Sequence, residues 1–286
     1  MGIMPAAFLG HGSPVNTLED NRYTRAWQAF GGVVPAPRAV LVVSAHWYAS
    51  VTAVTAMAKP RTIHDLFGFG HRLSSFQYPA PGAPDVAREI RDVVKPRYVG
   101  LDDDAWGLDH GTWSVMTHVF PQANVPIVQL SINGTKDLAY HLDIGMRLAP
   151  LRERGILIIG SGNVVHALGR VDPAQRDTGF DWAMRFDEAA REIMTTRPAD
   201  VLSLQQHPDF ARAVPTPDHF IPLVYLAGLA QHGGTVAKIL VDGYALGSLS
   251  MTSYTLDCEC PPSGRDDEPA ADPLPDRSVP PDQTNL

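Results

Sequence analysis

The feature that most constrains the fold of this chain is an alternation of short apolar runs with longer amphipathic segments. Residues 6–10 and 39–44 are apolar on both faces, as expected of strands buried between two helix layers. Residues 17–30 between them carry aromatic side chains on one helical face, and Thr17 with Asp20 forms a near capping box. A strand, a helix and a second buried strand form a βαβ unit, so this part of the sheet should be parallel.

The same pattern recurs along the rest of the chain. Residues 125–131 and 156–159 are predicted strands, residues 85–94, 138–152, 181–194 and 222–230 are predicted helices, and residues 235–241 and 249–256 are predicted to form a closing antiparallel pair. The sequence therefore predicts an α/β protein. We expect a single three-layer domain with a mostly parallel central sheet, some antiparallel edge strands and helices on both faces.

The acidic charge of the chain is concentrated at its end. The formal net charge is −8, and residues 257–286 contain eight acidic residues and two arginines, so the body carries only about −2. Such a body has no strong field to attract nucleic acid or an anionic membrane. From residue 259 onward, prolines and acids replace large apolar side chains. We therefore expect a folded domain over residues 1–258 and a disordered tail over residues 259–286.

The cysteines and the start of the chain bear on its compartment. Cys258 and Cys260 could supply only half of a four-ligand zinc site. Cysteine this sparse predicts no disulfide framework and is compatible with a reducing compartment. The first residues contain no basic segment and no long apolar run, which argues against a signal peptide. Since no stretch reaches the roughly 18 apolar residues of a membrane span, we expect a soluble, cytoplasmic protein.

Histidines gather where the predicted strands end. Of eleven histidines, five follow apolar strands or lie in tight loops, namely His11, His46, His110, His166 and His219. Ligands of open parallel sheets bind outside the carboxyl ends of the strands, so His11, His46 and His166 can converge on one crevice. Neutral imidazole is the commonest ligand for Zn and Fe(II). A single histidine beside a strand is more often structural, and among the other six only His64 is a fair candidate for a functional role.

One glycine-rich segment precedes His166. Gly160-Ser161-Gly162 lacks the pattern of a nucleophile elbow. It is also not a dinucleotide-binding loop, because Val165 stands where the third glycine of that motif is required. We interpret the segment as a flexible turn that delivers His166 into the crevice.

Six short motifs stand in order along the chain. They are Gly10-His11-Gly12-Ser13-Pro14, Ser44-Ala45-His46-Trp47, Tyr78-Pro79-Ala80-Pro81-Gly82, Asp109-His110-Gly111-Thr112-Trp113, Gly160-Ser161-Gly162-Asn163 with His166, and Pro217-Asp218-His219-Phe220. Their order and content resemble those of class III extradiol dioxygenases, with the closest likeness to the DOPA 4,5-dioxygenase-type branch. The resemblance covers roughly residues 4–256 and excludes the tail.

The resemblance implies a non-haem metal site, with one Fe(II) per chain or Zn(II) as the alternative. His11, His46 and His219 match the metal ligands of the family. His166 matches the acid/base histidine, and His110 matches a second histidine that faces the substrate. The implied substrates are a catechol and O2, and the ring would open beside its two hydroxyls to give a muconic semialdehyde.

The third ligand position departs from part of the family. Protocatechuate-cleaving relatives have a glutamate there, whereas this chain has His219 preceded by Asp218, which leaves Asp218 as a rival ligand. Four further residues are expected to contact the substrate: Ser13, Trp47, His64 and Asn163.

Two other functions are compatible with the same residues. An all-histidine site suits Zn(II), whose bound water titrates at a pKa of about 7, so a zinc hydrolase is chemically possible. A binding protein without activity, like the Memo-type relatives of this superfamily, is the other alternative. The presence of both His110 and His166 favours an enzyme, because a binding pocket needs no acid/base pair.

Overall fold

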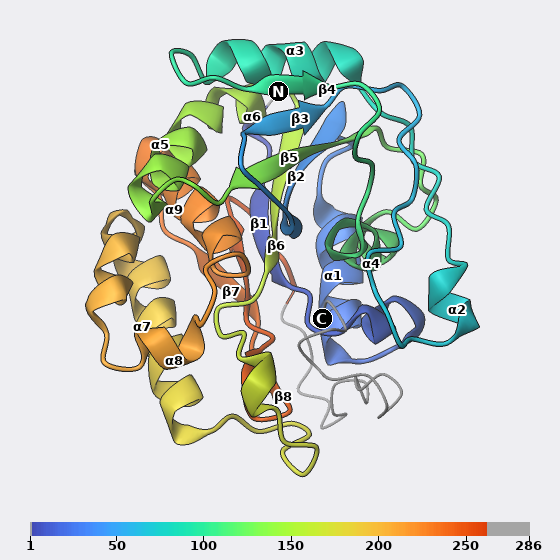
Figure 1. Cartoon of the computed structure of the whole chain (residues 1–286). Helices are drawn as coiled ribbons and strands as arrows, with labels where there is room; N and C mark the ends of the chain where they lie inside the picture. The colour runs from blue at the N-terminus through green and yellow to red at the C-terminus, as the bar shows by residue number, and fades with distance from the viewer. Residues whose placement is uncertain (1, 262–286) are drawn as a thin grey trace.

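The structure is a computed structural model that describes residues 2–261. A central sheet runs through the molecule (Figure 1). Within these residues the order of its strands is β4-β3-β5-β2-β6-β1-β10-β7. The strands are β1 Ala6–Gly10, β2 Ala39–Ala49, β3 Ala53–Thr55, β4 Gly100–Asp102, β5 Ile127–Asn133, β6 Ile156–Gly162, β7 Lys238–Val241 and β10 Ser253–Leu256, and a separate small pair consists of β8 Tyr244–Ala245 and β9 Leu249–Ser250.

The middle of the sheet is parallel and its flanks contain antiparallel pairs. Strands β5, β2, β6 and β1 pair in parallel, whereas β3 runs antiparallel to β5, and β10 runs antiparallel to β1 and β7. The predicted sheet, including its closing antiparallel pair, is therefore confirmed. Since the carboxyl ends of the parallel strands meet at one edge, residues following β1, β2 and β6 lie near one another.

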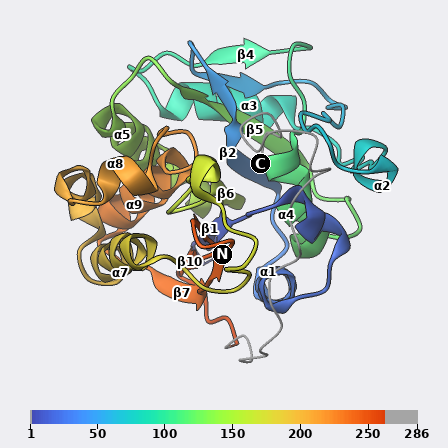
Figure 2. The same cartoon turned by 60° about the horizontal axis from the view of Figure 1, so that its bottom comes forward.

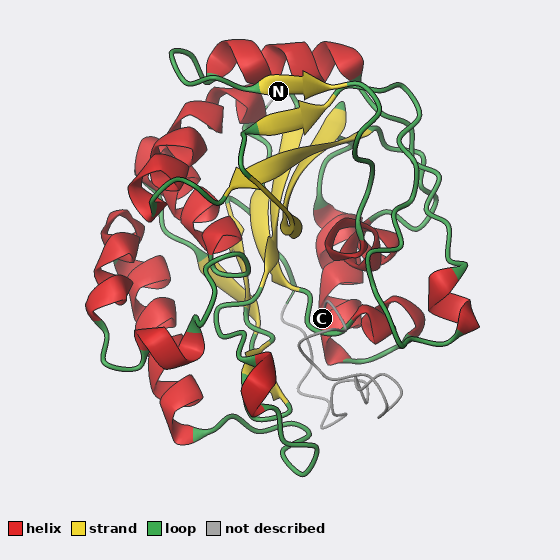
Figure 3. Ribbon diagram, in the orientation of Figure 1, coloured by secondary structure: helices red, strands yellow, loops and turns green. Residues whose placement is uncertain are grey.

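Helices cover both faces of the sheet, which gives the predicted three layers (Figure 3). The helical segments are η1 Pro14–Leu18, α1 Arg22–Val33, α2 His71–Ser74, α3 Pro84–Val93, α4 His110–Val119, α5 Leu138–Leu148, α6 Pro150–Glu153, η2 Leu168–Arg170, α7 Asp181–Thr196, η3 Pro198–Gln206, α8 Phe210–Ala213 and α9 Ile221–Gly233. Helices α3, α5, α7 and α9 share one hydrophobic cluster with the sheet, and α1 and α4 share another on the opposite face. Figure 2 shows α5, α7 and α9 on one side of the strands and α1 and α4 on the other.

Two predicted helices differ from the observed ones at their ends. The helix predicted over residues 17–30 begins at Arg22, because the side chain of Asn21 accepts hydrogen bonds from the Tyr23 and Thr24 amides and forms the capping box. The helix predicted over residues 138–152 is divided into α5 and α6, because Pro150 has no amide proton to continue the ladder.

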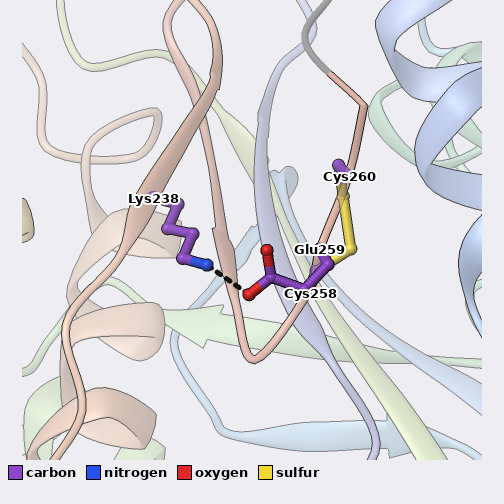
Figure 4. The surroundings of a disulfide bond; sticks show 4 residues. All are labelled: Lys238, Cys258, Glu259 and Cys260. Atoms are coloured by element: carbon purple, nitrogen blue, oxygen red, sulfur yellow. Dashed lines mark hydrogen bonds and ion pairs between the residues drawn. A yellow bond between two sulfur atoms is a disulfide. The ribbon is translucent and has the colours of Figure 1, made fainter.

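The segment after β10 corrects the expectation about cysteine. Cys258 and Cys260 form a disulfide, and Glu259 between them pairs with Lys238 on β7 (Figure 4). The bond joins positions only two residues apart, so it does not tie separate elements together in the way that a disulfide framework would. Of the predicted tail over residues 259–286, residues 262–286 lie outside the described part of the chain.

Among the described residues, no helix is both long enough and apolar enough to cross a bilayer.

Candidate metal centre

Strands β1, β2 and β6 bring the first two candidate ligands to one edge of the sheet. His11 directly follows β1, and His46 lies in β2 where its register with β5 shifts between Val43 and Tyr48. This shift releases the segment around His46 from regular pairing and re-aims its side chain. Because β6 lies between β1 and β2, the two rings face each other across the end of β6.

Two glycines at the end of β6 let the third candidate ligand approach. A Cβ at Gly162 would lie 2.2 Å from the carbonyl oxygen of His219, and one at Gly160 would lie 2.7 Å from that of Pro222. Any side chain at these positions would displace the start of α9, which follows His219. The segment predicted as a flexible turn is the end of strand β6. Because its glycines have no side chains, His219 can approach the sheet closely.

Three histidine rings form a compact triangle at this edge. The ring centroids lie 5.1 Å apart for His11 and His46, 5.3 Å for His11 and His219, and 4.9 Å for His46 and His219. One nitrogen from each ring can be chosen so that all three atoms lie within 4.8 Å of one another. An ion bound at the usual nitrogen–metal distance of about 2 Å could contact all three rings after small adjustments.

The hydrogen bonds of Ser161 determine which nitrogen of His11 can bind a metal. The Ser161 hydroxyl donates its one proton to the carbonyl oxygen of Gly111 at 2.5 Å. Its contact of 2.8 Å with His11 Nδ1 must then have the ring as donor. His11 therefore carries its proton on Nδ1, and its Nε2 keeps a lone pair.

Carboxylates lie on the Nδ1 side of the other two rings. Asp218 accepts a short hydrogen bond from Nδ1 of His219, and Asp65 Oδ2 lies 3.9 Å from Nδ1 of His46. On the opposite side of these rings, His219 Nε2 is buried without a hydrogen-bond partner in residues 2–261, and His46 Nε2 lies 3.3 Å from His11 Nε2. Buried nitrogen atoms that face one another in this way fit a shared metal ion, with the carboxylates behind the ligands.

The electrostatic surroundings keep the imidazoles available as ligands. Burial, and then the proximity of other histidines, lowers the pKa of His11 and that of His46 well below the ordinary value. These rings are therefore neutral at neutral pH. Burial opposes ionisation of Asp218, but the charge of His219 and the hydrogen bond from it hold the pKa of Asp218 below its usual range. The centre thus combines two neutral imidazoles, His11 and His46, with an ionised carboxylate behind His219.

His110 stands beside the triangle at the first position of α4. Its ring centroid is 3.8 Å from that of His46. Asp65 Oδ1 lies 3.0 Å from His110 Nδ1, and the same oxygen accepts the His110 backbone amide at 2.9 Å. The side chain of Asp109 caps this helix by accepting the amide of Thr112. Both ring nitrogens of His110 are buried: Nδ1 lies close to Asp65 without the geometry of a hydrogen bond, and Nε2 has no hydrogen-bond partner in the described part of the chain.

The carboxylate of Asp109 lies deeper, beneath the same helix. It accepts hydrogen bonds from Ser44 and Gln129. Burial, and then the charge of Asp65, raises the pKa of Asp109 to about 6.

His166 lies on the other side of the triangle. Its ring stacks on that of His219, with centroids 3.4 Å apart and an interplanar angle of 6°. The backbone holds it there, because its amide donates to the carbonyl of Ala213 and its residue bridges to Leu249. A nitrogen of His166 can also be grouped with Asp218 and His219 in a second set of close donor atoms.

Two of the residues predicted to contact substrate lie at the crevice and make defined contacts. Ser13 caps the short helix η1 and is buried close to His11 in the chain. Asn163 is also buried, and it ties the end of β6 to the small hairpin by donating to the carbonyl of Ser250 at 2.7 Å. The backbone amide of Asn163 donates to the carbonyl of His219. The contacts of Asn163 therefore support the segment that carries His219.

The other two predicted contact residues have partners of their own. Trp47 stacks on Trp106, with centroids 5.5 Å apart and nearly parallel rings. His64 Nε2 lies 2.7 Å from the carbonyl oxygen of Phe76, so that nitrogen is engaged by the backbone. The next residue, Asp65, is the one that reaches the histidine cluster. Asp65, Ser161 and Trp106 were not predicted as site residues, because nothing in an isolated sequence marks an aspartate, a serine or a tryptophan that acts through a neighbour.

An α/β domain with a cluster of buried histidines at the carboxyl edge of its parallel strands is typical of a metalloenzyme. Comparisons with known proteins make this class more specific. Residues 6–255 match the family described as the catalytic LigB subunit of aromatic ring-opening dioxygenase.

Curated and solved relatives agree with that match. The chain is 45% identical over 257 residues to the 4,5-DOPA dioxygenase extradiol of Escherichia coli strain K12, covering 88% of this chain and 94% of the relative. It is 32% identical over 258 residues to the 4,5-DOPA dioxygenase extradiol of Beta vulgaris, covering 86% and 94%. A crystal structure of an uncharacterized protein from Escherichia coli K12 superimposes with a TM-score of 0.78 at 40% identity, covering 88% and 99%.

The chain therefore belongs to the LigB family of class III extradiol dioxygenases. It is an oxidoreductase of the metal-dependent type that opens aromatic rings, as the resemblance of its motifs predicted.

Proposed function

We propose that this dioxygenase opens the ring of a DOPA-like catechol at a single Fe(II) held by His11, His46 and His219. The convergence of three histidine rings on one point, each with its Nδ1 turned toward Ser161 or a carboxylate, is the observation that carries the ligand assignment. The substrate class comes from the relatives that are named for 4,5-DOPA. In this proposal Asp218 is not a ligand, because it accepts a hydrogen bond from Nδ1 of His219.

The metal would supply the redox chemistry, since a site with three ligands on one face leaves positions for a catechol and for O2. The side chains of the protein handle the protons. His166 would take a phenolic proton as substrate binds and return it when the ring opens, a role suited to imidazole at neutral pH. His110 Nε2, which has no hydrogen-bond partner among residues 2–261, would hydrogen-bond a substrate oxygen.

The metal identity can be tested by reconstitution. Apoprotein loaded with Fe(II) without oxygen, then mixed with aerated L-DOPA, should form a ring-opened product that absorbs in the visible range. Both atoms of ¹⁸O2 should appear in that product. Protein loaded with Zn(II) should bind the catechol without turnover. Stoichiometric Fe(II) binding with no ring opening of any tested catechol would contradict the proposal, and hydrolysis with Zn(II) would favour a zinc enzyme.

The ligand set makes a separate prediction. His46→Ala or His219→Ala should lose stoichiometric metal binding, falling from about one ion per chain, because two imidazoles cannot complete the three-ligand face. The domain should still fold, since its core is hydrophobic and extends well away from the centre. Metal content after dialysis and circular dichroism measure these two results. His232→Ala at the end of α9 is the matched control, and full metal content in both variants would rule this ligand set out.

A further inference from the structure

Asp65 contacts two histidines of the centre through different oxygens. Its Oδ1 lies 2.9 Å from the backbone nitrogen of His110 and 3.0 Å from Nδ1 of the same residue. Its Oδ2 lies 3.9 Å from Nδ1 of His46. One carboxylate therefore spans a proposed metal ligand and a proposed substrate-facing histidine that comes from a different element.

The loop that carries Asp65 is fixed to the protein on both sides of it. Ile63 donates its amide to the carbonyl of Leu108, and its own carbonyl accepts from Trp113 Nε1 at 2.9 Å. After Asp65, the side chains of Leu66 and Phe69 are buried in the same cluster as Trp113. The position of the Asp65 backbone is therefore set by the packing of its neighbours against α4.

The 3.0 Å approach of Asp65 Oδ1 to Nδ1 favours one position for the proton of His110. An ionised carboxylate can only accept hydrogen bonds, so a His110 ring that pairs with it must carry hydrogen on Nδ1. In the neutral ring, Nε2 then holds a lone pair and is able to accept a proton. If the carboxylate were absent, nothing in the described contacts would prevent the other tautomer, in which Nε2 carries the hydrogen and cannot accept a proton.

We propose that Asp65 is a positioning residue that fixes the tautomer and orientation of His110 and steadies the ring of His46 from behind. This inference rests on the proposed function, in which His46 binds the metal and His110 meets the substrate. In this proposal Asp65 contacts neither the metal nor the substrate, yet it sets the placement of His46 and His110 relative to each other.

The charge of Asp65 can be separated from its shape by substitution. Asp65→Asn keeps the size, and its Oδ1 can still accept from both the backbone amide and Nδ1 of His110, but it removes the charge and places an NH2 group where Oδ2 lies, toward Nδ1 of His46. Asp65→Ala removes the charge and the acceptor oxygens. The matched control is Asp137→Asn, which also removes one carboxylate that accepts a backbone amide, that of Tyr140 at 2.9 Å. Asp137 is exposed at the start of α5, away from the histidines in the contacts described above.

The first measurement needs no turnover. In zinc-loaded protein labelled with ¹⁵N-histidine, long-range ¹H–¹⁵N spectra distinguish the two tautomers, and the His110 signals are identified by their absence in His110→Gln. The wild type and Asp137→Asn should show His110 protonated on Nδ1. Asp65→Ala should lose that pattern, whereas Asp65→Asn should keep it, because the amide oxygen can take over both contacts of Oδ1. If Asp65 does not fix the tautomer, Asp65→Ala should keep the wild-type pattern.

Zinc affinity and kinetics provide the other measurements. Chelator competition should show binding weakened by about 10–100-fold in both Asp65 variants, as is typical when a residue behind a metal ligand is lost. With Fe(II), kcat should fall more than KM changes, because the substrate still finds its ligand positions. A wild-type tautomer in Asp65→Ala, or zinc affinity within 2-fold of that of Asp137→Asn in both Asp65 variants, would overturn the proposal. If the wild type opens no catechol, the spectra and the zinc titration still decide the role of Asp65, so the two failures are distinguishable.

Discussion

Individual hydrogen bonds decide what each ring in the centre can do. The hydroxyl of Ser161 has one proton, which it donates to the carbonyl of Gly111. Nδ1 of His11 must therefore donate to Ser161, and Nε2 of His11 keeps a lone pair as a Lewis base. Asp218 has the same effect on His219. Chemistry at the centre therefore depends on atoms that lie one contact away from it.

At His166 the structure supports two roles that a substitution can separate. If His166 is the acid/base group, His166→Ala should keep its metal while turnover falls by ~10²–10⁴, the usual worth of a positioned general acid or base. His166→Gln should be nearly as impaired, because an amide does not relay a proton at neutral pH. Metal analysis and steady-state rates measure these outcomes.

Two results would contradict the acid/base role of His166. Loss of metal in His166→Ala would make this residue a ligand, which its stacking on His219 and its proximity to Asp218 allow. Full activity in His166→Gln would leave it only a structural part of the loop after β6.

Sequence alone predicted the histidines of the centre but not the residues that support them. Five histidines at strand ends and tight loops could be found because imidazole is a common ligand and because parallel strands share a carboxyl edge. Asp65 could not be found in this way. Its proposed role depends on how the loop between β3 and α2 packs against α4, and no local sequence pattern predicts that packing.

Helix α4 packs closely against the centre. A Cβ at Gly111 would lie 2.5 Å from Ser44 Oγ and 2.6 Å from His46 Cδ2. Gly111→Ala should therefore push the start of α4 away from β2, cost about 1–3 kcal/mol of unfolding free energy as overpacking does, and weaken metal binding. Chemical denaturation of the apoprotein and a metal titration test both effects.

The control for that substitution is Gly32→Ala in α1. A Cβ there meets nothing within 4 Å, so the variant should be stabilised by about 0.5–1 kcal/mol through helix propensity, with unchanged metal affinity. If Gly111→Ala behaved like this control, the helix would be free to shift and the close packing would be unimportant.

The contact between α5 and α9 contains a buried histidine outside the centre. Burial lowers the pKa of His141 from 6.5 to about 4, and its Nδ1 lies 3.1 Å from the Tyr225 hydroxyl. The folded protein keeps this ring neutral, whereas the unfolded chain takes up a proton below pH 6.5. The stability linked to His141 is therefore complete above that pH and is lost as the pH falls toward 4.

Urea denaturation can measure this loss. Wild-type protein should lose about 2 kcal/mol more than His141→Gln between pH 7 and pH 5, a value that follows from the two pKa values through linkage. Other titrating groups are common to both proteins and cancel in the difference. Equal pH slopes would show that His141 is protonated in the folded state.

The predicted elements were accurate where burial dominates and less so at their ends. Strands β1, β2, β5 and β6 are apolar on both faces and were found from that pattern alone. Short strands β3 and β4 were missed, because three-residue strands carry too little periodicity to be detected. The start of α1 was misplaced because Thr17 resembled a cap, while the actual cap is made by Asn21.

For the whole molecule, the position at which the chain may be shortened is set by one ion pair. Asp257 Oδ2 lies 2.7 Å from Arg152 Nη2, and the Arg152 side chain is only 1% exposed. Truncation after Leu256 should therefore cost about 1–3 kcal/mol, because it removes a partner of a buried charged group. Truncation after Pro261 retains the pair and should change stability by less than about 0.5 kcal/mol.

Thermal denaturation of the two truncated proteins, with the disulfide kept oxidised, tests this prediction. Arg152→Met in the longer truncated protein is the control, since it removes the ion pair without shortening the chain further. Equal stability of the two truncated proteins would mean that Arg152 is satisfied by its other bond, to the carbonyl of Met4.

The proposed ligands come from distant parts of the chain, since His11 follows the first strand and His219 precedes the last long helix. An ion held between them would act as a cross-link whose strength depends on concentration. At a free ion concentration of about 100 times the dissociation constant, the ion would stabilise the folded state by about 2.7 kcal/mol. A melting curve recorded against free metal would therefore serve as a binding isotherm, even for ions and inhibitors that support no reaction.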